Sequence, residues 1–349
     1  MFELKNNDSS WTIIKKSGKP VLVYGMGNGA DKIIDELNAR NIEICGVTAS
    51  DGFVRGQMFR GFKVKKISDF EGDFIIVPAF GSSIPSVMEN ILNLYKKCEL
   101  IYTCVPVAGN EIADEEFFEK NQEKIKQVYE LLSDKSKVIY ENILNFIYCG
   151  DLKYLLSATD DKDEIFTEYF NFGQNESYLD IGAYKGDTVD EFLYYTGGNY
   201  RKITAVEPDA KNFIKLKNKF EGKENIICLN CVCTDYNGVT AFASQGGRQS
   251  HISQTGKEIK AVTVDSLTGN EPLDYIKTDA EGEEMKIIEG AEKTIERCSP
   301  KLNIALYHKF SDMFEIPLKI HSINSEYKFE IRHHPYFPAW DTNLYCFKE

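Results

Sequence analysis

Short apolar runs rich in β-branched residues alternate with helical stretches along this chain, in two separate series. The first series runs from Lys19 to about Thr103, and the second begins at Ser177. Continuous apolar strands separated by helices indicate parallel sheets that are buried on both faces. Because 349 residues exceed one ordinary domain, the pattern predicts an α/β protein with two Rossmann-like, doubly wound domains.

Residues 110–170 differ from both series, since their large apolar side chains recur at helical spacing with no strand-like alternation. We therefore expect an amino-terminal Rossmann-like domain at 1–109, a helical connector at 110–170 and a second α/β domain at 171–349. Strands are predicted at 21–25, 42–47, 74–80, 100–105, 177–182, 202–208, 225–232, 274–281, 301–308, 327–334 and 343–349. Helices of the second domain are predicted at about 187–196, 210–220, 283–296 and 314–323. Asn237-Gly238 predicts a hairpin turn.

Composition narrows the class of protein. The formal net charge of −13 disfavours nucleic acid as a partner, because phosphate-binding proteins are usually basic. Nine cysteines, an odd number, suit a reducing compartment. On a strand Cys231 and Cys233 share one face and Cys228 lies on the other, so we expect these three to pack in the core rather than to bind a metal ion. The start of the chain does not resemble a signal peptide, and the apolar runs are shorter than the roughly 20 residues of a membrane span. We expect a cytoplasmic protein.

The strongest local motif is a strand, a D-x-G-x-x-x-G turn and a helix at 178–188. Glycine at 182 and 186 lets the backbone approach a ligand closely, and the helix amides favour negative charge. Glu207 ends the next strand, where an acid can accept hydrogen bonds from ribose hydroxyls. The alternative is an ordinary βα turn followed by a solvated acid.

A cluster of acidic residues at 279–284 follows the fourth strand of the second domain, at the edge where doubly wound folds bind their ligands. Asp279 and Glu281 lie nearest the strand tip and are the site candidates, whereas Glu283 and Glu284 are expected to be a solvated helix start. His308, at the tip of the fifth strand, has an unperturbed pKa near 6.5 and is the predicted general base, with Asp279 as its competitor. Alternatively, Asp279, Glu281 and His308 hold a divalent ion.

These segments, together with 262–267 and 342–347, resemble the FkbM family of S-adenosylmethionine-dependent methyltransferases, over about Ile165 to Phe347. The resemblance implies a class I methyltransferase sheet of seven strands whose last strand is antiparallel, with S-adenosylmethionine as cofactor. Asp180, Gly182 and Gly186 would line its methionine part and Glu207 its ribose. The implied contacts further include Ala183, Asp187, Asp209, Cys233, Thr234, Asp235 and Asp279. Many relatives carry a glutamate shortly before the histidine of the fifth strand, whereas this chain reads Leu306-Tyr307-His308.

The resemblance implies methyl transfer to a hydroxyl, on a sugar, a glycan precursor or a related small molecule. A glycine-rich turn at Gly25, Gly27 and Gly29 could hold a phosphate in the amino-terminal domain, which is similar to that of PglD-type sugar acetyltransferases. The alternatives are a nucleotide-sugar- or NAD-binding protein, or an oxidoreductase, that works through this domain, and a scaffold that forms homo-oligomers. The polar loop 246–251 is predicted to cover the acceptor.

Overall fold

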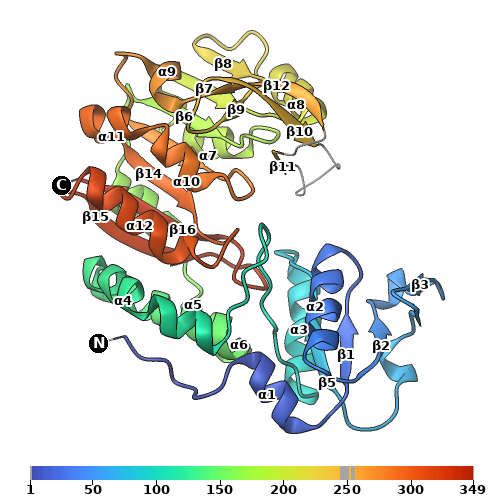
Figure 1. The fold of residues 1–349 in the computed structure, drawn as a ribbon. Coiled ribbons are helices and arrows are strands. Elements are labelled where there is room, and N and C mark those ends of the chain that lie inside the picture. Colours follow the sequence, from blue (N-terminus) through green and yellow to red (C-terminus); the bar gives the residue numbers. More distant parts are fainter. Residues whose placement is uncertain (1, 244–250, 253–255, 349) are drawn as a thin grey trace. The chain divides into compact units, whose positions relative to one another are not determined.

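The computed structural model describes residues 2–243, 251–252 and 256–348, and it divides the chain into two compact units (Figure 1). Unit 1 consists of residues 1–129, 134–160 and 332–342, and unit 2 of residues 130–133, 161–331 and 343–349. Residues 246–250 of the predicted acceptor loop lie outside the described residues. Most of the helical segment 110–170 falls within unit 1, with its last residues in unit 2.

Unit 1 contains a three-stranded parallel sheet in the order β2-β1-β5. Its strands are Val21–Tyr24 (β1), Ile44–Thr48 (β2) and Ile75–Pro78 (β5), with a small hairpin of Met58–Phe59 (β3) and Phe62–Lys63 (β4). Its helices are Ser10–Ser17 (α1), Asn28–Ala39 (α2), Pro85–Lys97 (α3), Glu115–Leu131 (α4), Asp134–Cys149 (α5) and Leu152–Ala158 (α6). The apolar faces of α1 and α2 bury Trp11, Ile33 and Leu37 in the core of this sheet.

The strand predicted at 100–105 is wrong. Only Leu100 bridges to Ile76, and the backbone amide of Tyr102 donates to the carbonyl of Gly150, after α5, at 3.0 Å. The amide of Tyr102 therefore bonds to the residue that follows a helix instead of to a neighbouring strand.

A late segment completes unit 1. The backbone groups of Ser82 and Phe337 exchange two hydrogen bonds of 2.7 and 3.0 Å. A Cβ atom on Gly81 would lie 2.3 Å from the ring of Trp340, so only glycine fits there. The turn at 332–342 is thus a packed part of this unit although it comes from the other end of the sequence.

Unit 2 is built on a seven-stranded sheet in the order β15-β16-β14-β13-β6-β7-β8. Its strands are Ser177–Ile181 (β6), Lys202–Val206 (β7), Ile226–Leu229 (β8), Tyr275–Thr278 (β13), Lys301–Ala305 (β14), Lys328–His333 (β15) and Thr342–Phe347 (β16). The pairs from β8 to β14 are parallel, and β16 runs antiparallel to β14. The predicted mostly parallel sheet with an antiparallel last strand is confirmed.

The helices of this unit are Asp187–Tyr195 (α7), Ala210–Lys219 (α8), Val264–Thr268 (α9), Glu284–Glu289 (α10), Glu292–Cys298 (α11) and Asp312–Ile323 (α12), with a π-helix at Ile165–Phe170. The single helix predicted at 283–296 is therefore two. The break falls at Gly290, where a Cβ atom would lie 2.2 Å from the carbonyl oxygen of Thr234. A close backbone approach, which periodicity does not reveal, interrupts the helix.

A second, four-stranded sheet has the order β11-β10-β12-β9 and comprises Val232–Cys233 (β9), Gly238–Ala243 (β10), His251–Ile252 (β11) and Lys257–Val262 (β12). Both β9 and β10 pair with β12, so the hairpin predicted at Asn237-Gly238 is wrong. The side-chain oxygen of Asn237 instead accepts hydrogen bonds from the amide of Thr263 and the hydroxyl of Ser266, at the start of α9.

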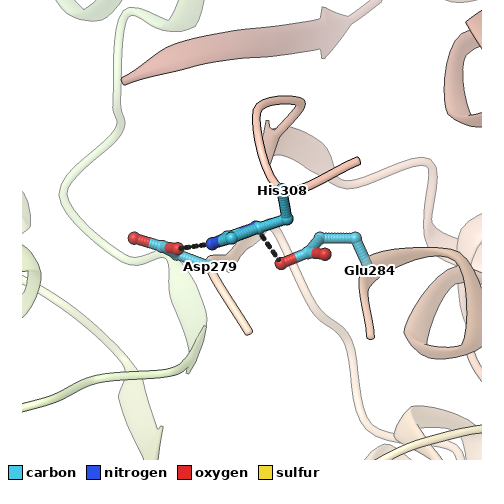
Figure 2. A group of neighbouring side chains, drawn as sticks. All are labelled: Asp279, Glu284 and His308. Carbon is cyan, nitrogen blue, oxygen red and sulfur yellow. Dashed lines mark ion pairs between the residues drawn. The ribbon is translucent and has the colours of Figure 1, made fainter. Parts of the chain in front are cut away.

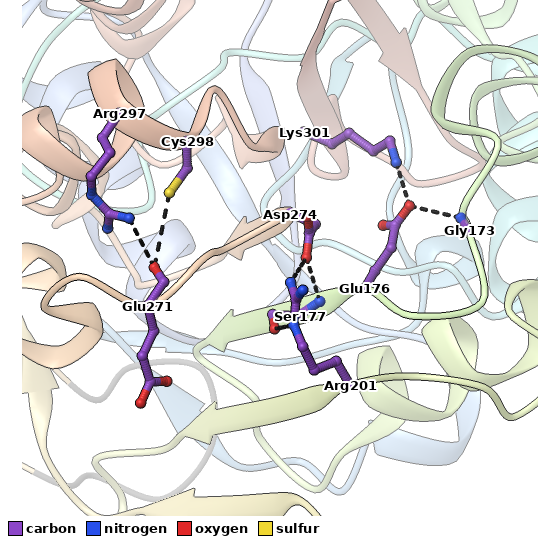
Figure 3. Close-up of polar contacts among 9 residues, drawn as sticks. All are labelled: Gly173, Glu176, Ser177, Arg201, Glu271, Asp274, Arg297, Cys298 and Lys301. Atoms are coloured by element: carbon purple, nitrogen blue, oxygen red, sulfur yellow. Dashed lines mark hydrogen bonds and ion pairs between the residues drawn. The ribbon is translucent and has the colours of Figure 1, made fainter.

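Polar contacts tie the amino ends of the central strands together (Figure 3). Asp274, before β13, accepts a hydrogen bond from the amide of Ser177 at 2.7 Å and forms an ion pair with Arg201, before β7. Glu176 accepts a hydrogen bond from Lys301 of β14 at 2.6 Å. These contacts fix the strands in register, so that their carboxyl ends meet at the opposite edge of the sheet.

Candidate functional site

The turn after β6 brings three strand tips together. The amides of Gly182 and Ala183 both donate to the carbonyl of Val206, the last residue of β7, at 3.0 Å. Gly182 has a φ of 78°, and a Cβ atom there would lie 1.9 Å from the carbonyl oxygen of Asp279. The backbone of this turn therefore approaches the tip of β13 more closely than any residue other than glycine allows.

The second glycine of the motif begins a helix. Gly186 has a φ of 84° and precedes α7, whose N-terminus has no side-chain cap. A Cβ atom on Gly186 would lie 2.4 Å from the ring of Phe220. Asp187, the first residue of α7, is exposed. The helix amides are therefore left for a ligand or solvent, as the motif predicts.

A buried ion pair lies beneath this turn. Asp180 is fully buried, and its Oδ1 lies 3.6 Å from the ammonium of Lys277, which also donates to the carbonyl of Gly182 at 3.3 Å. Burial opposes the charge on Lys277, but the carboxylates of Asp180, Asp279 and Asp187 outweigh it and raise the pKa of the lysine. Within the part of the chain that the structure describes, Oδ1 of Asp180 has no hydrogen-bond partner.

Sequence reasoning missed Lys277. A usable signal was present, because this is the one charged residue in the buried strand β13, directly opposite Asp180 on β6.

Glu207 is 6% exposed at the tip of β7. Its two carboxylate oxygens accept hydrogen bonds from the amides of Tyr184, at 2.9 Å, and Asp209, at 2.8 Å. Burial raises the pKa of Glu207 to about 7, although both amides oppose the shift. Each oxygen keeps a second lone pair, so the side chain can still accept hydroxyl groups.

The other predicted cofactor residues have different surroundings. Asp209 caps α8, since its Oδ1 accepts the amides of Lys211 and Asn212 at 2.9 Å. Thr234 and Asp235, after β9, share a hydrogen bond of 3.0 Å. Asn230, which sequence reasoning missed, directly follows β8 and donates to the carbonyls of Glu207 and Pro208 at 2.8 and 2.9 Å.

The tips of β13 and β14 carry a histidine surrounded by carboxylates (Figure 2). Nε2 of His308 lies 3.4 Å from Oδ1 of Asp279 and 3.6 Å from Oε2 of Glu281, while Nδ1 lies 3.0 Å from Oε1 of Glu284. The hydroxyl of Tyr307 donates to Oδ1 of Asp279 at 2.9 Å. The side chain of Asp279 is 38% exposed and that of Glu281 is 27% exposed, so these two acids face outward.

Two expectations about this cluster are wrong. Glu284 is fully buried instead of solvated, because the imidazole and the amide of Ala280 occupy Oε1. The side chain of His308 is 1% exposed instead of open to the crevice. Burial lowers its pKa, but Glu284, Asp279 and Glu281 outweigh burial and raise it to about 9. A raised pKa favours the imidazolium, whereas a general base needs a free nitrogen lone pair, so these surroundings disfavour His308 as the base.

The same cluster is the group of potential metal ligands found among the described residues, with ligand atoms of Asp279, Glu284 and His308 within 4.8 Å of one another. A metal ion needs an unprotonated imidazole nitrogen. Here Nε2 faces the carboxylate of Asp279 and Nδ1 that of Glu284, so a protonated ring forms ion pairs with both. The arrangement fits an ion-paired histidine better than a metal centre.

Residues 180–343 match the methyltransferase FkbM domain. The resemblance expected from the motifs is confirmed for this part of the chain, and the match supports a methyltransferase function. Over 97% of this chain and 92% of the other, the fold is similar to the crystal structure of methyltransferase FkbM from Methylobacillus flagellatus KT, with 19% identity and a TM-score of 0.72. This likeness shows the fold.

More distant likenesses are confined to about half the chain. Aeropyrum pernix fibrillarin with natively bound S-adenosyl-L-methionine has 12% identity and a TM-score of 0.32, over 49% of this chain and 66% of that one. An rRNA methylase from Streptococcus thermophilus has 14% identity and a TM-score of 0.32, over 50% of this chain and 88% of that one. No curated protein matches the chain significantly. Among the described helices, none is long and apolar enough to cross a membrane.

The glycine-rich turn at Gly25, Gly27 and Gly29 lies in unit 1, apart from the FkbM domain. Packing accounts for two of its glycines, because a Cβ atom would lie 2.9 Å from the ring of Phe80 at position 25 and 2.7 Å from the carbonyl of Ala79 at position 29. Gly27 has a φ of 145° and open space around it. No comparison supports the expected similarity to PglD-type acetyltransferases.

Proposed function

We propose that the FkbM domain transfers a methyl group from S-adenosylmethionine to a hydroxyl group, on a sugar or a glycan precursor. The observation that carries this proposal is the pair of outward-facing carboxylates, Asp279 and Glu281, beside the glycine turn of β6. Ionised carboxylates only accept hydrogen bonds, which suits an acceptor rich in hydroxyl groups.

The residues around the turn fit the cofactor. Among the described residues, Asp180 offers an oxygen without a hydrogen bond, and Glu207 offers free lone pairs at the next tip. Gly182 lets the turn between them lie against the carbonyl of Asp279, which a side chain would prevent. We assign the methionine part to Asp180, Gly182, Ala183, Gly186 and Asp187, the ribose to Glu207, and the adenine side to Thr234 and Asp235. When bound, the cofactor supplies a methyl group already activated on a sulfonium, so the protein has to orient the acceptor and take its proton.

Asp279 is our candidate for the proton acceptor. It is the more exposed of the two partly exposed carboxylates of the cluster. The hydroxyl of Tyr307 donates to it, the ring of His308 pairs with it, and the more distant ammonium of Lys277 acts on its charge. His308 is buried behind it and therefore acts on Asp279 rather than on the acceptor. General-base catalysis of this kind contributes about 10²–10⁴-fold to the rate.

Two measurements test the proposal. Calorimetry should detect binding of S-adenosylhomocysteine to the intact chain, and a panel of sugars and nucleotide sugars with labelled S-adenosylmethionine should yield a methylated product. Asp279→Asn should lower kcat by about 10²-fold or more while leaving the Kd for S-adenosylhomocysteine unchanged.

Glu281→Gln is the matched control, and an equal loss there would assign the proton to Glu281. Absence of S-adenosylhomocysteine binding would refute the proposal. Protection from unfolding by NAD or a UDP-sugar alone would transfer the function to unit 1.

A further inference from the structure

Glu284 is a buried carboxylate that the proposed chemistry does not use. It is the first residue of α10 and is fully buried, yet it lies one residue from Glu283, which is partly exposed and pairs with Lys286 at 2.9 Å. Burying a carboxylate is unfavourable unless other groups pair with it. The groups that pair with Glu284 therefore indicate what it does.

Glu284 contacts both elements that frame Asp279. Its Oε1 accepts a hydrogen bond from the amide of Ala280, the residue after Asp279, at 2.7 Å. The same oxygen lies 3.0 Å from Nδ1 of His308, whose Nε2 faces Oδ1 of Asp279 (Figure 2). One carboxylate thus holds the backbone on one side of Asp279 and the imidazole on the other.

The backbone after Asp279 needs such support. Glu281 has a φ of 52° and Gly282 a φ of 100°, so two consecutive residues adopt left-handed conformations. A left-handed conformation at a non-glycine residue is unfavourable and persists where surrounding contacts impose it. The bond from Ala280 to Glu284 spans this turn, and the ammonium of Lys309 donates to the carbonyl of Gly282 on its far side.

The charges around His308 come from three elements. The strand-tip turn contributes Asp279 and Glu281, α10 contributes Glu284, and α12 contributes Asp312, whose carboxyl is influenced by both Glu284 and His308. Lys309 is the nearby cation. Among the acids, Glu284 is the one that faces Nδ1, so it decides how the ring is turned toward Asp279.

We propose that Glu284 is a positioning residue for the methyl transfer, which orients His308 and the turn at Ala280 and through them fixes Asp279 toward the acceptor. The inference rests on the proposed function for its catalytic consequence, but the contact between Glu284 and His308 can be tested without turnover.

The first test is the NMR titration of the histidine ring protons in Glu284→Gln, with Glu283→Gln as control. Both changes remove one negative charge from adjacent positions. The chain has five histidines, so the resonance of His308 is assignable from His308→Asn. Its pKa, about 9 in the parent protein, should fall by about one unit or more in Glu284→Gln and stay unchanged in Glu283→Gln. Equal titration in both variants would overturn the proposal.

The second test is kinetic. Glu284→Gln should lower kcat about 10- to 100-fold with little change in KM for S-adenosylmethionine, whereas Glu283→Gln should leave both unchanged. Because the side-chain oxygen of Gln can still accept the hydrogen bond from the amide of Ala280, Glu284→Gln acts through His308. The double variant Glu284→Gln/His308→Asn should therefore be no slower than His308→Asn alone.

The double variant also removes both buried charges together, which guards against a single variant that fails to fold. Additive losses in the double variant would refute the positioning role. If the parent protein neither binds S-adenosylhomocysteine nor methylates any acceptor, the proposed function fails, while the titration still decides whether Glu284 controls His308.

Discussion

Binding of S-adenosylhomocysteine should depend on the ionisation of Glu207. Burial raises the pKa of this carboxyl to about 7, above its ordinary value of 4.5, because its two amide partners do not offset the loss of water. In the ligand-free protein the carboxyl thus contributes stability that is fully present below about pH 4.5 and is lost as the pH rises through about 7. Ribose hydroxyls donate to the carboxylate, so ligand binding favours the ionised form.

The size of the effect follows from that pKa. About one tenth of Glu207 is ionised at pH 6 and about nine tenths at pH 8, so the affinity should rise up to about tenfold, or ~1.4 kcal/mol, over this range. Calorimetry at pH 6, 7 and 8 measures it. Glu207→Gln should bind more weakly at pH 8, and its affinity should vary little with pH.

Two results would refute this reasoning. Equal affinity of the parent protein at pH 6 and pH 8 would show that the charge of Glu207 does not matter for binding. A tenfold pH dependence that survives in Glu207→Gln would point to Asp312, whose pKa burial and the nearby Glu284 also raise to about 7.

Two stability predictions accompany it. Gly182→Ala and Gly222→Ala both place alanine at a positive φ, 78° and 75°, but only the alanine at 182 meets a neighbour, at 1.9 Å. In urea unfolding, Gly222→Ala should lower the free energy of unfolding by about 1–2 kcal/mol, and Gly182→Ala by a further 1–3 kcal/mol. Equal losses in the two variants would contradict the close approach of Gly182 to Asp279. Lys277→Met should lower the free energy of unfolding by about 3–5 kcal/mol, because Asp180 loses its buried partner, and adding Asp180→Asn should recover much of that loss. A double variant no more stable than Lys277→Met would contradict the pairing of the two residues.

The sheet edge that carries the candidate site was predictable, because the carboxyl ends of parallel strands meet at one edge and Asp180, Glu207, Asp279 and His308 each lie at or near such an end. The surroundings of these side chains were not. Asp209 follows Glu207 by two residues, yet it caps a helix, since its oxygen finds the amides of α8.

Which acidic side chains are buried could not be predicted from the sequence either. Glu283 and Glu284 are identical in type and adjacent, and a helix start explains both from sequence alone. Only the path of β14 brings His308 against Glu284, so the choice between a solvated and a buried glutamate depends on a contact far away in the chain. The raised pKa of His308, which disfavours it as the base, follows from the same contact.

Residues 332–342 belong to unit 1, and this affects the order in which the two units can fold. The partner of Ser82, Phe337, and the ring against Gly81, Trp340, are synthesised after residues 161–331 of unit 2. Unit 1 therefore cannot finish folding before nearly the whole of unit 2 has been synthesised. A fragment that stops near residue 170 would leave that edge of unit 1 uncovered, so unit 1 depends on residues from the far side of unit 2 in the sequence.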